Sequence, residues 1–391
     1  MRKAAALSLM ISALAGPGLA ATCGGSFGAF VDGLKDEARS EGHSRATVDA
    51  FFAGVAQDPA TLRADRAQGI FQRPFTDFAR RVISQNRMDN GARNNQRFDA
   101  VFDAIEDRYG VSRGVLLAFW ALETDYGGFQ GDFNTRNSLV TLAHDCRRPE
   151  LFRPQVMAAV ELFANGNFDP ATTTGAWAGE IGMVQMLPED IIDHGVDADG
   201  NGRVDLKTSA PDALFSGGAM LQSLGWNAGE PWLQEVTVPA QMNWAETGIE
   251  VRKPIRAWRR AGVRARQGDL PAGATEAALV LPQGKDGPAF LAYRNFDVFF
   301  EWNQSFTYVT TAAYFATRLE GAAVFDPRTP AQGLSGDQMK DLQRKLQARG
   351  HDVGKVDGIL GARTRAAVRA EQIRLGLPAD AWPTPALLSR M

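Results

Sequence analysis

The chain has 391 residues, of which 45% are hydrophobic and 22% are charged, and its formal net charge is −3. This composition excludes a disordered chain, because the apolar residues suffice for one large core and a second, smaller one. The near-neutral charge and dispersed bases argue against a nucleic-acid-binding protein, which would carry a basic stripe or domain. The histidines lie far apart and no cysteine cluster accompanies them, so a catalytic zinc site is not expected.

The N-terminus has the pattern of a signal peptide. Arg2 and Lys3 precede an apolar run from Ala4 to Leu14, and Ala20 suits cleavage after residue 20. The run is shorter than the roughly 20 apolar residues that a membrane-spanning helix needs, so no membrane anchor is expected. We predict a signal peptide over residues 1–20 and a soluble, periplasmic protein.

The chain has two cysteines, Cys23 near the mature N-terminus and Cys146. Export takes both to an oxidising compartment, which predicts a disulfide. Closing so long a loop stabilises the fold by about 4 kcal/mol in the chain-entropy picture. A catalytic cysteine is the alternative, but no nearby His–Asn pairing supports it.

Apolar residues recur at helical spacing from Phe27 to Leu34 and from Phe98 to Ile105, which predicts a helical domain. Between about Trp232 and Phe296 the pattern changes to short β-prone segments broken by Pro and Gly, which predicts a small inserted β-containing lobe. Helical spacing returns from Trp302 to Leu319.

A separate module follows. Asp326-Pro327-Arg328-Thr329-Pro330 is typical of a linker, and Ser335 and Gln338 have capping-box spacing before a helix. We predict a main domain over residues 21–325, a linker over residues 326–334 and a C-terminal domain over residues 335–391.

The segment from Val111 to Gly128 contains the candidate acid. Ser112 can cap a helix whose body, Val115 to Leu122, is apolar nearly all round and therefore buried. Glu123 follows in the last turn, before the stop at Gly127-Gly128. Desolvation and the negative end of the helix dipole raise the pKa of Glu123, which suits a general acid. The alternative is a glutamate at a frayed surface end or in a structural salt bridge.

Asp125 cannot serve as the second carboxylate of an ordinary glycosidase. Residues two apart on a helix do not face each other, so Asp125 and Glu123 cannot flank one bond. A glycosidase here would work with one carboxylate or use a remote second one.

The string Glu123-Thr124-Asp125-Tyr126-Gly127 after a buried helix resembles the catalytic signature of the lytic murein transglycosylase B family. Three further segments resemble family motifs and occur in family order. They are Cys146-Arg147-Arg148-Pro149-Glu150, Gly179 to Pro188 with its G-x-x-G-x-x-Q-x-x-P spacing, and Trp302-Asn303-Gln304-Ser305 with Tyr308.

The resemblance implies a mainly α, lysozyme-like catalytic domain with the small β-containing lobe inserted. It also implies cleavage of the β-1,4 bond between N-acetylmuramic acid and N-acetylglucosamine in peptidoglycan, with no required cofactor. In the family, one Glu protonates the leaving oxygen and then acts as base on the muramic 6-hydroxyl, which gives a 1,6-anhydro end. That role falls on Glu123 here.

The resemblance also assigns substrate-binding residues. Gln185 and Asn303 would contact sugar amides and hydroxyls, Tyr308 would line the cleft near Glu123, and Arg147 and Arg148 would meet a carboxylate. The alternatives are ordinary: a turn cap for Gln185, a core residue for Tyr308 and a solvated face for the arginines. Where the family often has Ser, this chain has Ala176, so the hydroxyl contact of that Ser is not expected.

The stretch from Asp197 to Asp205 has the D-x-D-x-N-G spacing of a calcium loop. Asp197, Asp199, Asn201 and Asp205 supply oxygens, but the twelfth position is Thr208 instead of the bidentate Glu. The family carries a similar loop. The segment is therefore either a weak structural calcium site or an Asx-rich turn.

The C-terminal residues from Leu342 to Val368 resemble the three-helix peptidoglycan-binding domain. Glu371 stands where the family usually has an aromatic residue. The expected partner is the peptidoglycan glycan strand, and cell-wall assembly proteins are candidate partners. Two other functions stay open: a hydrolytic muramidase, with Glu180 as its nearest second carboxylate, and a catalytically inactive wall-binding scaffold.

Overall fold

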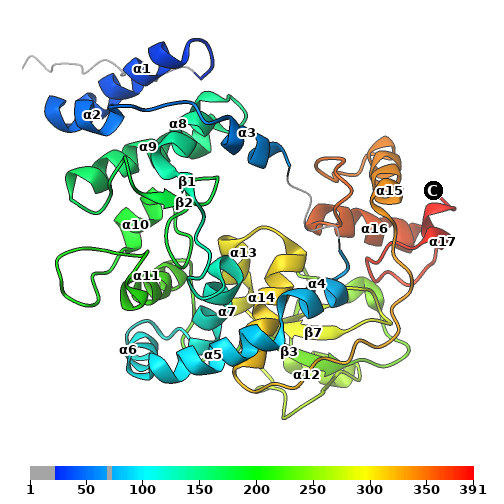
Figure 1. Cartoon of the computed structure of the whole chain (residues 1–391). Helices are drawn as coiled ribbons and strands as arrows, with labels where there is room; N and C mark the ends of the chain where they lie inside the picture. Colours follow the sequence, from blue (N-terminus) through cyan, green and yellow to red (C-terminus); the bar gives the residue numbers. More distant parts are fainter. Residues whose placement is uncertain (1–22, 68–72) are drawn as a thin grey trace, which may run out of the picture. The chain divides into compact units, whose positions relative to one another are not determined.

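A computed structural model describes residues 23–67 and 73–391 (Figure 1). The predicted signal peptide, residues 1–20, lies outside the described residues. The chain forms two compact units: unit 1 includes the chain up to Asp65 and Asp132–Gly179, and unit 2 comprises Arg66–Gly131 and Glu180–Met391. Within the described ranges, no helix is long and apolar enough to cross a membrane. The mainly α fold with small sheets confirms the predicted fold class.

Unit 1 is a cluster of helices with a two-stranded antiparallel sheet, β1 with β2. Its elements are α1 (Phe27–Ser40), α2 (Arg45–Phe52), α3 (Pro59–Arg66), β1 (Phe133–Asn134), α8 (Thr135–His144), α9 (Pro149–Ala164) and β2 (Thr174–Gly175). The helix predicted from Phe27 is α1, which buries Phe30, Val31 and Leu34. A disulfide joins Cys23 to Cys146, with Cα atoms 5.2 Å apart, which confirms the predicted pair.

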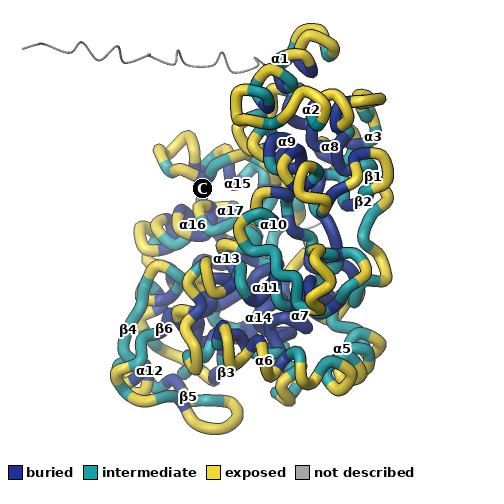
Figure 2. The backbone as a smooth tube through the Cα atoms, turned by 90° about the vertical axis from the view of Figure 1, so that its left-hand side faces the viewer, coloured by how far each residue is buried: buried dark blue, intermediate teal, exposed yellow. Residues whose placement is uncertain are grey.

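The helices of unit 2 surround α7 and α14, which lie side by side (Figure 1) and are buried over most of their length (Figure 2). These helices are α4 (Phe75–Val82), α5 (Gln85–Arg97), α6 (Asp99–Tyr109), α7 (Arg113–Thr124), α10 (Pro188–His194), α11 (Ala210–Ser223), α13 (Asn295–Trp302) and α14 (Phe306–Leu319). The buried helix α7 is the one that its apolar sequence predicts.

Both ends of α7 follow from local chemistry. The hydroxyl of Ser112 accepts from the backbone N–H of Gly114, as predicted for its N-cap. The helix ends earlier than the predicted glycine stop, because Asp125 (φ 53°) and Tyr126 (φ 62°) adopt the left-handed conformation. A short polar side chain such as Asp tolerates this conformation better than most residues.

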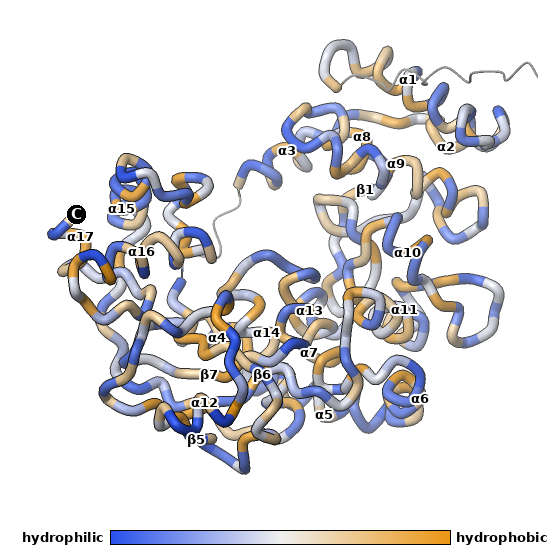
Figure 3. Tube along the Cα trace, turned by 180° about the vertical axis from the view of Figure 1, so that it is seen from behind, coloured by the Kyte–Doolittle hydropathy of each residue, from blue (hydrophilic) through white to orange (hydrophobic). Residues whose placement is uncertain are grey.

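The inserted lobe is a five-stranded antiparallel sheet in the order β4-β6-β7-β3-β5. Its elements are β3 (Leu233–Thr237), a 3-10 helix (Trp244–Glu246), β4 (Arg252–Pro254), α12 (Ile255–Arg260), β5 (Arg264–Ala265), β6 (Glu276–Val280) and β7 (Ala289–Ala292). On β7, Phe290 packs into the core around α7 and α14, whereas Leu291 packs with Trp258 on the other face. Both faces of β7 are therefore buried, and its residues are hydrophobic (Figure 3).

The C-terminal module contains α15 (Gly336–Ala348), α16 (Ala362–Arg374) and α17 (Pro385–Leu388), as predicted for a small three-helix domain. The capping box is present: Ser335 and Gln338 each accept from the other's backbone N–H. The core is small and centres on Leu342, Leu346 and Val368.

Candidate functional site

Glu123 occupies the last turn of α7, and the residues after it are fixed from several sides. The hydroxyl of Thr124 donates to the carbonyl of Met183 at 2.7 Å and accepts from the N–H of Gly127 at 2.9 Å. The phenol of Tyr126 donates to the carbonyl of Arg87 at 2.9 Å, and the Arg87 guanidinium pairs with Asp125 at 2.9 Å. The backbone that carries Glu123 is therefore held in one conformation.

The carboxyl of Glu123 faces neutral donors. The hydroxyl of Tyr308 and the indole N–H of Trp302 both donate to its Oε1 atom, the latter at 3.2 Å. Trp302 ends α13 and stacks on Phe119 of α7 with ring centroids 4.3 Å apart. Tyr308 lies in the first turn of α14. The side-by-side packing of α7 and α14 thus brings both donors to the carboxyl.

Burial dominates the proton affinity of Glu123. It raises the pKa of the carboxyl, while the hydrogen bonds from Tyr308 and Trp302 lower it by less. Among the residues that the structure describes, no charged side chain contributes to this pKa. Burial also raises the pKa of Tyr308 well above its usual value, so its hydroxyl stays a neutral donor. The geometry favours a carboxylic acid that keeps its proton.

The side-chain amides of Gln185 and Asn303 each form a hydrogen bond within their own turn. Gln185 has a φ of 54° in the turn closed by the bridge between Ile181 and Met186, and its side-chain amide donates to the carbonyl of Gly182 at 2.7 Å. The side-chain oxygen of Asn303 accepts from the N–H of Ser305 at 2.9 Å, between α13 and α14. Asn303 thereby orders the connection that carries Trp302 and Tyr308.

Arg147 and Arg148 belong to unit 1, whereas Glu123, Tyr308, Asn303 and Gln185 belong to unit 2. Within unit 1 both guanidiniums bind the buried Asp65, Arg147 at 2.7 Å and Arg148 at 2.5 Å. Each arginine side chain remains about one-third exposed. Asp65 was not predicted as their partner.

The carboxylates that gather at the calcium-like loop differ from the predicted set of Asp197, Asp199, Asn201 and Asp205. One oxygen each of Asp197, Asp199 and Asp212 lie within 4.8 Å of one another. Asp205 lies outside this group and accepts from the backbone N–H groups of Lys207 and Thr208. Asp212 lies in the first turn of α11, is fully buried, and accepts from backbone N–H groups of the loop. An all-oxygen set of this kind fits a hard cation such as Ca²⁺.

Sequence reasoning missed Trp302 and Asp212 as members of these two groups. Trp302 belongs to the Trp302-Asn303-Gln304-Ser305 motif, and its indole N–H can donate. Its contact with Glu123, however, depends on the packing of α13 against α7. Asp212 lies beyond the twelve-residue loop. The sequence feature that could have identified Asp212 is its position in the first turn of a helix capped by Ser209, directly after the loop.

In the module, Glu371 lies in a cationic environment. Its carboxylate contacts Arg349 at 3.1 Å, Arg374 at 2.7 Å and the Nε2 atom of His351 at 2.9 Å. The hydrogen bond from Arg374 contributes most to lowering the pKa of Glu371. The glutamate is therefore a structural ion-pair centre where an aromatic residue was expected.

Comparisons with known proteins identify relatives of this chain. The family description "Transglycosylase SLT domain" matches residues 26–317, and a peptidoglycan binding domain matches residues 335–391. The membrane-bound lytic murein transglycosylase B of Escherichia coli (strain K12) is 24% identical over 154 residues, which span 39% of this chain and 42% of that protein.

Two solved structures place the likeness in space. SltB3 from Pseudomonas aeruginosa, in complex with NAG-anhNAM-pentapeptide, is 37% identical with a TM-score of 0.86 and covers 94% of this chain and 99% of its own. The Escherichia coli lytic transglycosylase Slt35, in complex with calcium, is 20% identical with a TM-score of 0.65 over 77% of this chain and 96% of its own. The latter is a likeness of fold.

Proposed function

Since the chain belongs to the family of transglycosylase SLT domains, whose members are lytic transglycosylases, we propose that it cleaves peptidoglycan glycan strands with Glu123 as its single general acid and base. The bond cleaved is the β-1,4 linkage between N-acetylmuramic acid and N-acetylglucosamine. The observation that carries the proposal is a half-buried carboxyl whose hydrogen-bond partners, Tyr308 and Trp302, are both neutral.

The two donors also distinguish the oxygens of Glu123. Both donate to Oε1, so in the neutral acid Oε1 acts as the carbonyl-type acceptor and Oε2 carries the proton. That proton passes to the glycosidic oxygen as its bond to the muramic C1 breaks, and Glu123 becomes a carboxylate. The hydrogen bonds from Tyr308 and Trp302 stabilise the negative charge that forms.

In the second step the carboxylate of Glu123 takes the proton of the muramic 6-hydroxyl, whose oxygen bonds to C1. This closes the 1,6-anhydro ring and restores the acid, so no water is consumed and no second carboxylate takes part. SltB3 supports this product by analogy, because its structure holds an anhydro-muramic ligand.

The remaining predicted residues have supporting roles in this proposal. Gln185 and Asn303 present amide groups to the sugar from ordered turns, and Arg147 and Arg148 direct their exposed donors to a carboxylate of the substrate. The C-terminal module binds the glycan strand. The apolar leader and the Cys23–Cys146 disulfide support action in the periplasm.

The test is mass spectrometry of purified sacculi digested with the wild-type protein and with Glu123→Gln. We expect anhydromuropeptides from the wild type alone, because Gln cannot deliver or accept the proton. Reducing-end products would overturn the proposal in favour of a hydrolytic muramidase and direct attention to Glu180. Binding to sacculi without any product from the wild type would make the chain a wall-binding scaffold.

We also propose that Asp197, Asp199 and Asp212 hold a structural Ca²⁺ ion that ties the loop to α11. Calcium in excess over EDTA should raise the thermal midpoint of the protein, since a ligand at about a hundred times its Kd stabilises by roughly 2.7 kcal/mol. Asp212→Asn is the matched variant and should respond much less. An unchanged wild-type midpoint, or an equal rise in the variant, would contradict this site.

A further inference from the structure

The C-terminal module contacts the rest of unit 2 through a buried arginine. Arg365 of α16 is only 8% exposed, and its guanidinium donates to the carbonyl of Pro282 at 2.7 Å and to that of Leu281 at 3.4 Å. The same guanidinium lies over the ring of Phe306, with its central carbon 4.3 Å from the ring centroid. Burial lowers the pKa of Arg365 to about 9, so the side chain remains a cation at neutral pH.

Phe306 belongs to the turn that supports Glu123. It is the first residue of α14, and the cap Ser305 before it accepts from the N–H of Tyr308. Tyr308, in the same turn, donates its hydroxyl to Glu123. One side of the Phe306 ring therefore faces the module's cation, while the backbone of Phe306 continues into the turn that presents Tyr308.

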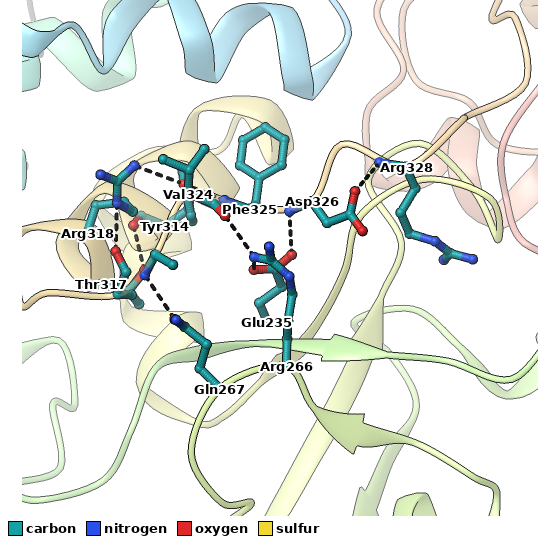
Figure 4. A network of polar contacts seen from close by, with 12 residues as sticks. Glu235, Arg266, Gln267, Tyr314, Thr317, Arg318, Val324, Phe325, Asp326 and Arg328 are labelled. Carbon is teal, nitrogen blue, oxygen red and sulfur yellow. Dashed lines mark hydrogen bonds and ion pairs between the residues drawn. The ribbon is translucent and has the colours of Figure 1, made fainter.

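The segment that leads to the module is also tied down (Figure 4). Arg266 donates to the carbonyl of Val324 at 2.7 Å, Glu235 accepts from the N–H of Asp326 at 2.8 Å, and the hydroxyl of Tyr314 accepts from the N–H of Phe325 at 3.0 Å. The module thus follows a chain segment already bound to the sheet and to α14, which limits the loss of entropy when Arg365 docks.

We propose that Arg365 is a positioning residue for the active site: by holding Phe306, the wall-binding module keeps the first turn of α14, and the hydroxyl of Tyr308, against Glu123. The inference rests on the proposed role of Glu123. It makes the module part of the catalytic apparatus as well as a wall-binding domain.

Arg369 provides a matched comparison. It lies one turn further along α16 and also reaches the rest of unit 2, where it pairs with Glu250 at 3.1 Å, a residue outside α14. The charged groups around Arg365 are Arg369, Asp380 and Glu250. Near Tyr308, the charged groups are Glu123 and Arg87, and Arg87 pairs with Asp125. Substitution of Arg365 or Arg369 leaves these groups in place.

The experiment compares full-length Arg365→Met, Phe306→Leu and Arg369→Met with the wild type. The first readout is the pH profile of kcat and KM on soluble glycan fragments. We expect Arg365→Met to lower kcat by about threefold to thirtyfold, the range that a desolvated cation–π contact supplies, with KM nearly unchanged. The loosened Tyr308 hydrogen bond should raise the pKa of Glu123, which moves the alkaline limb of kcat to higher pH.

The second readout is the carboxyl titration of Glu123 by NMR of glutamate-labelled protein, assigned with Glu123→Gln. It works even if sacculi digestion gives no anhydro product, so failure of the proposed function is distinguishable from failure of this inference. Phe306→Leu should reproduce the effect, and Arg369→Met should not. Equal effects of Arg365→Met and Arg369→Met, or an unchanged Glu123 titration in Arg365→Met and Phe306→Leu, would overturn the proposal.

If Arg365→Met unfolds, Arg365→Lys keeps the cation but loses the planar fork and still tests the contact. A double variant of Arg365→Met and Phe306→Leu adds a check on coupling. Because both substitutions remove one contact, their combined effect on kcat should be smaller than the product of the separate effects. Independent, multiplicative effects would also overturn the inference.

Discussion

Two glutamates in this molecule have pKa values that are shifted in opposite directions. Glu123 faces the hydroxyl of Tyr308 and the indole of Trp302, and burial raises its pKa. Glu371 in the C-terminal module faces Arg349, Arg374 and His351, and its pKa is lowered. Burial alone therefore does not make a glutamate an acid catalyst. The charge of the groups that share its cavity decides whether it keeps its proton.

The comparison can be broken by giving Glu123 a cationic neighbour. Trp302→Arg should lower the pKa of Glu123, so the acid is ionised at neutral pH and kcat at pH 7 falls about a hundredfold, within the range for losing general acid catalysis. The control Trp302→Phe removes the donor without adding charge and should move the alkaline limb of the pH profile upward. A shift of both variants in the same direction would contradict the charge argument.

The reverse change is to remove the charge of Glu371. Glu371→Gln should lower the free energy of unfolding of the protein by about 2 kcal/mol at pH 7, because its arginines lose their buried counter-ion. The folded pKa is lowered, so this contribution is present above the unfolded pKa of about 4.3 and is lost as pH falls through the folded pKa. Denaturant unfolding over a series of acidic pH values measures it, and a difference that did not shrink as pH falls would argue against an ionic origin.

An effect of opposite sign is expected at Glu123. Its folded pKa is raised, so the wild type loses stability as pH rises from the unfolded pKa through the folded pKa. Glu123→Gln should therefore be more stable than the wild type at pH 7, by up to about 1.4 kcal/mol for each pH unit between the unfolded and folded pKa values, and equal to it near pH 4. Thermal unfolding across this pH range checks the sign. A variant less stable than the wild type at pH 7 would show that Glu123 is not strained by burial.

Local sequence predicted the helix on which Glu123 lies and the first helix of the module that contains Glu371. The apolar run from Val115 to Leu122 required a buried helix, and Ser112 defined its start. The capping box of Ser335 and Gln338 likewise defined α15. Such features were predictable because each depends on residues within a few positions along the chain.

The predictions that differed from the structure involve contacts across the chain. Helix α7 ends before the predicted stop at Gly127-Gly128, where Asp125 and Tyr126 form hydrogen bonds with Arg87 of α5. Asp212 joins Asp197 and Asp199 through the packing of α11 against its preceding loop. Their spacing in sequence carries no such information.

The sequence by itself determined the helical class and the candidate acid, because periodicity, capping and motif spacing are local properties, and it determined the disulfide partners because the chain has two cysteines. Only the tertiary structure decided what surrounds each charge. Trp302 and Tyr308 reach Glu123 from 179 and 185 positions away, and Arg349 reaches Glu371 from 22 positions away. Proton affinity depends on these neighbours in space, so the chemistry of the site was settled by packing.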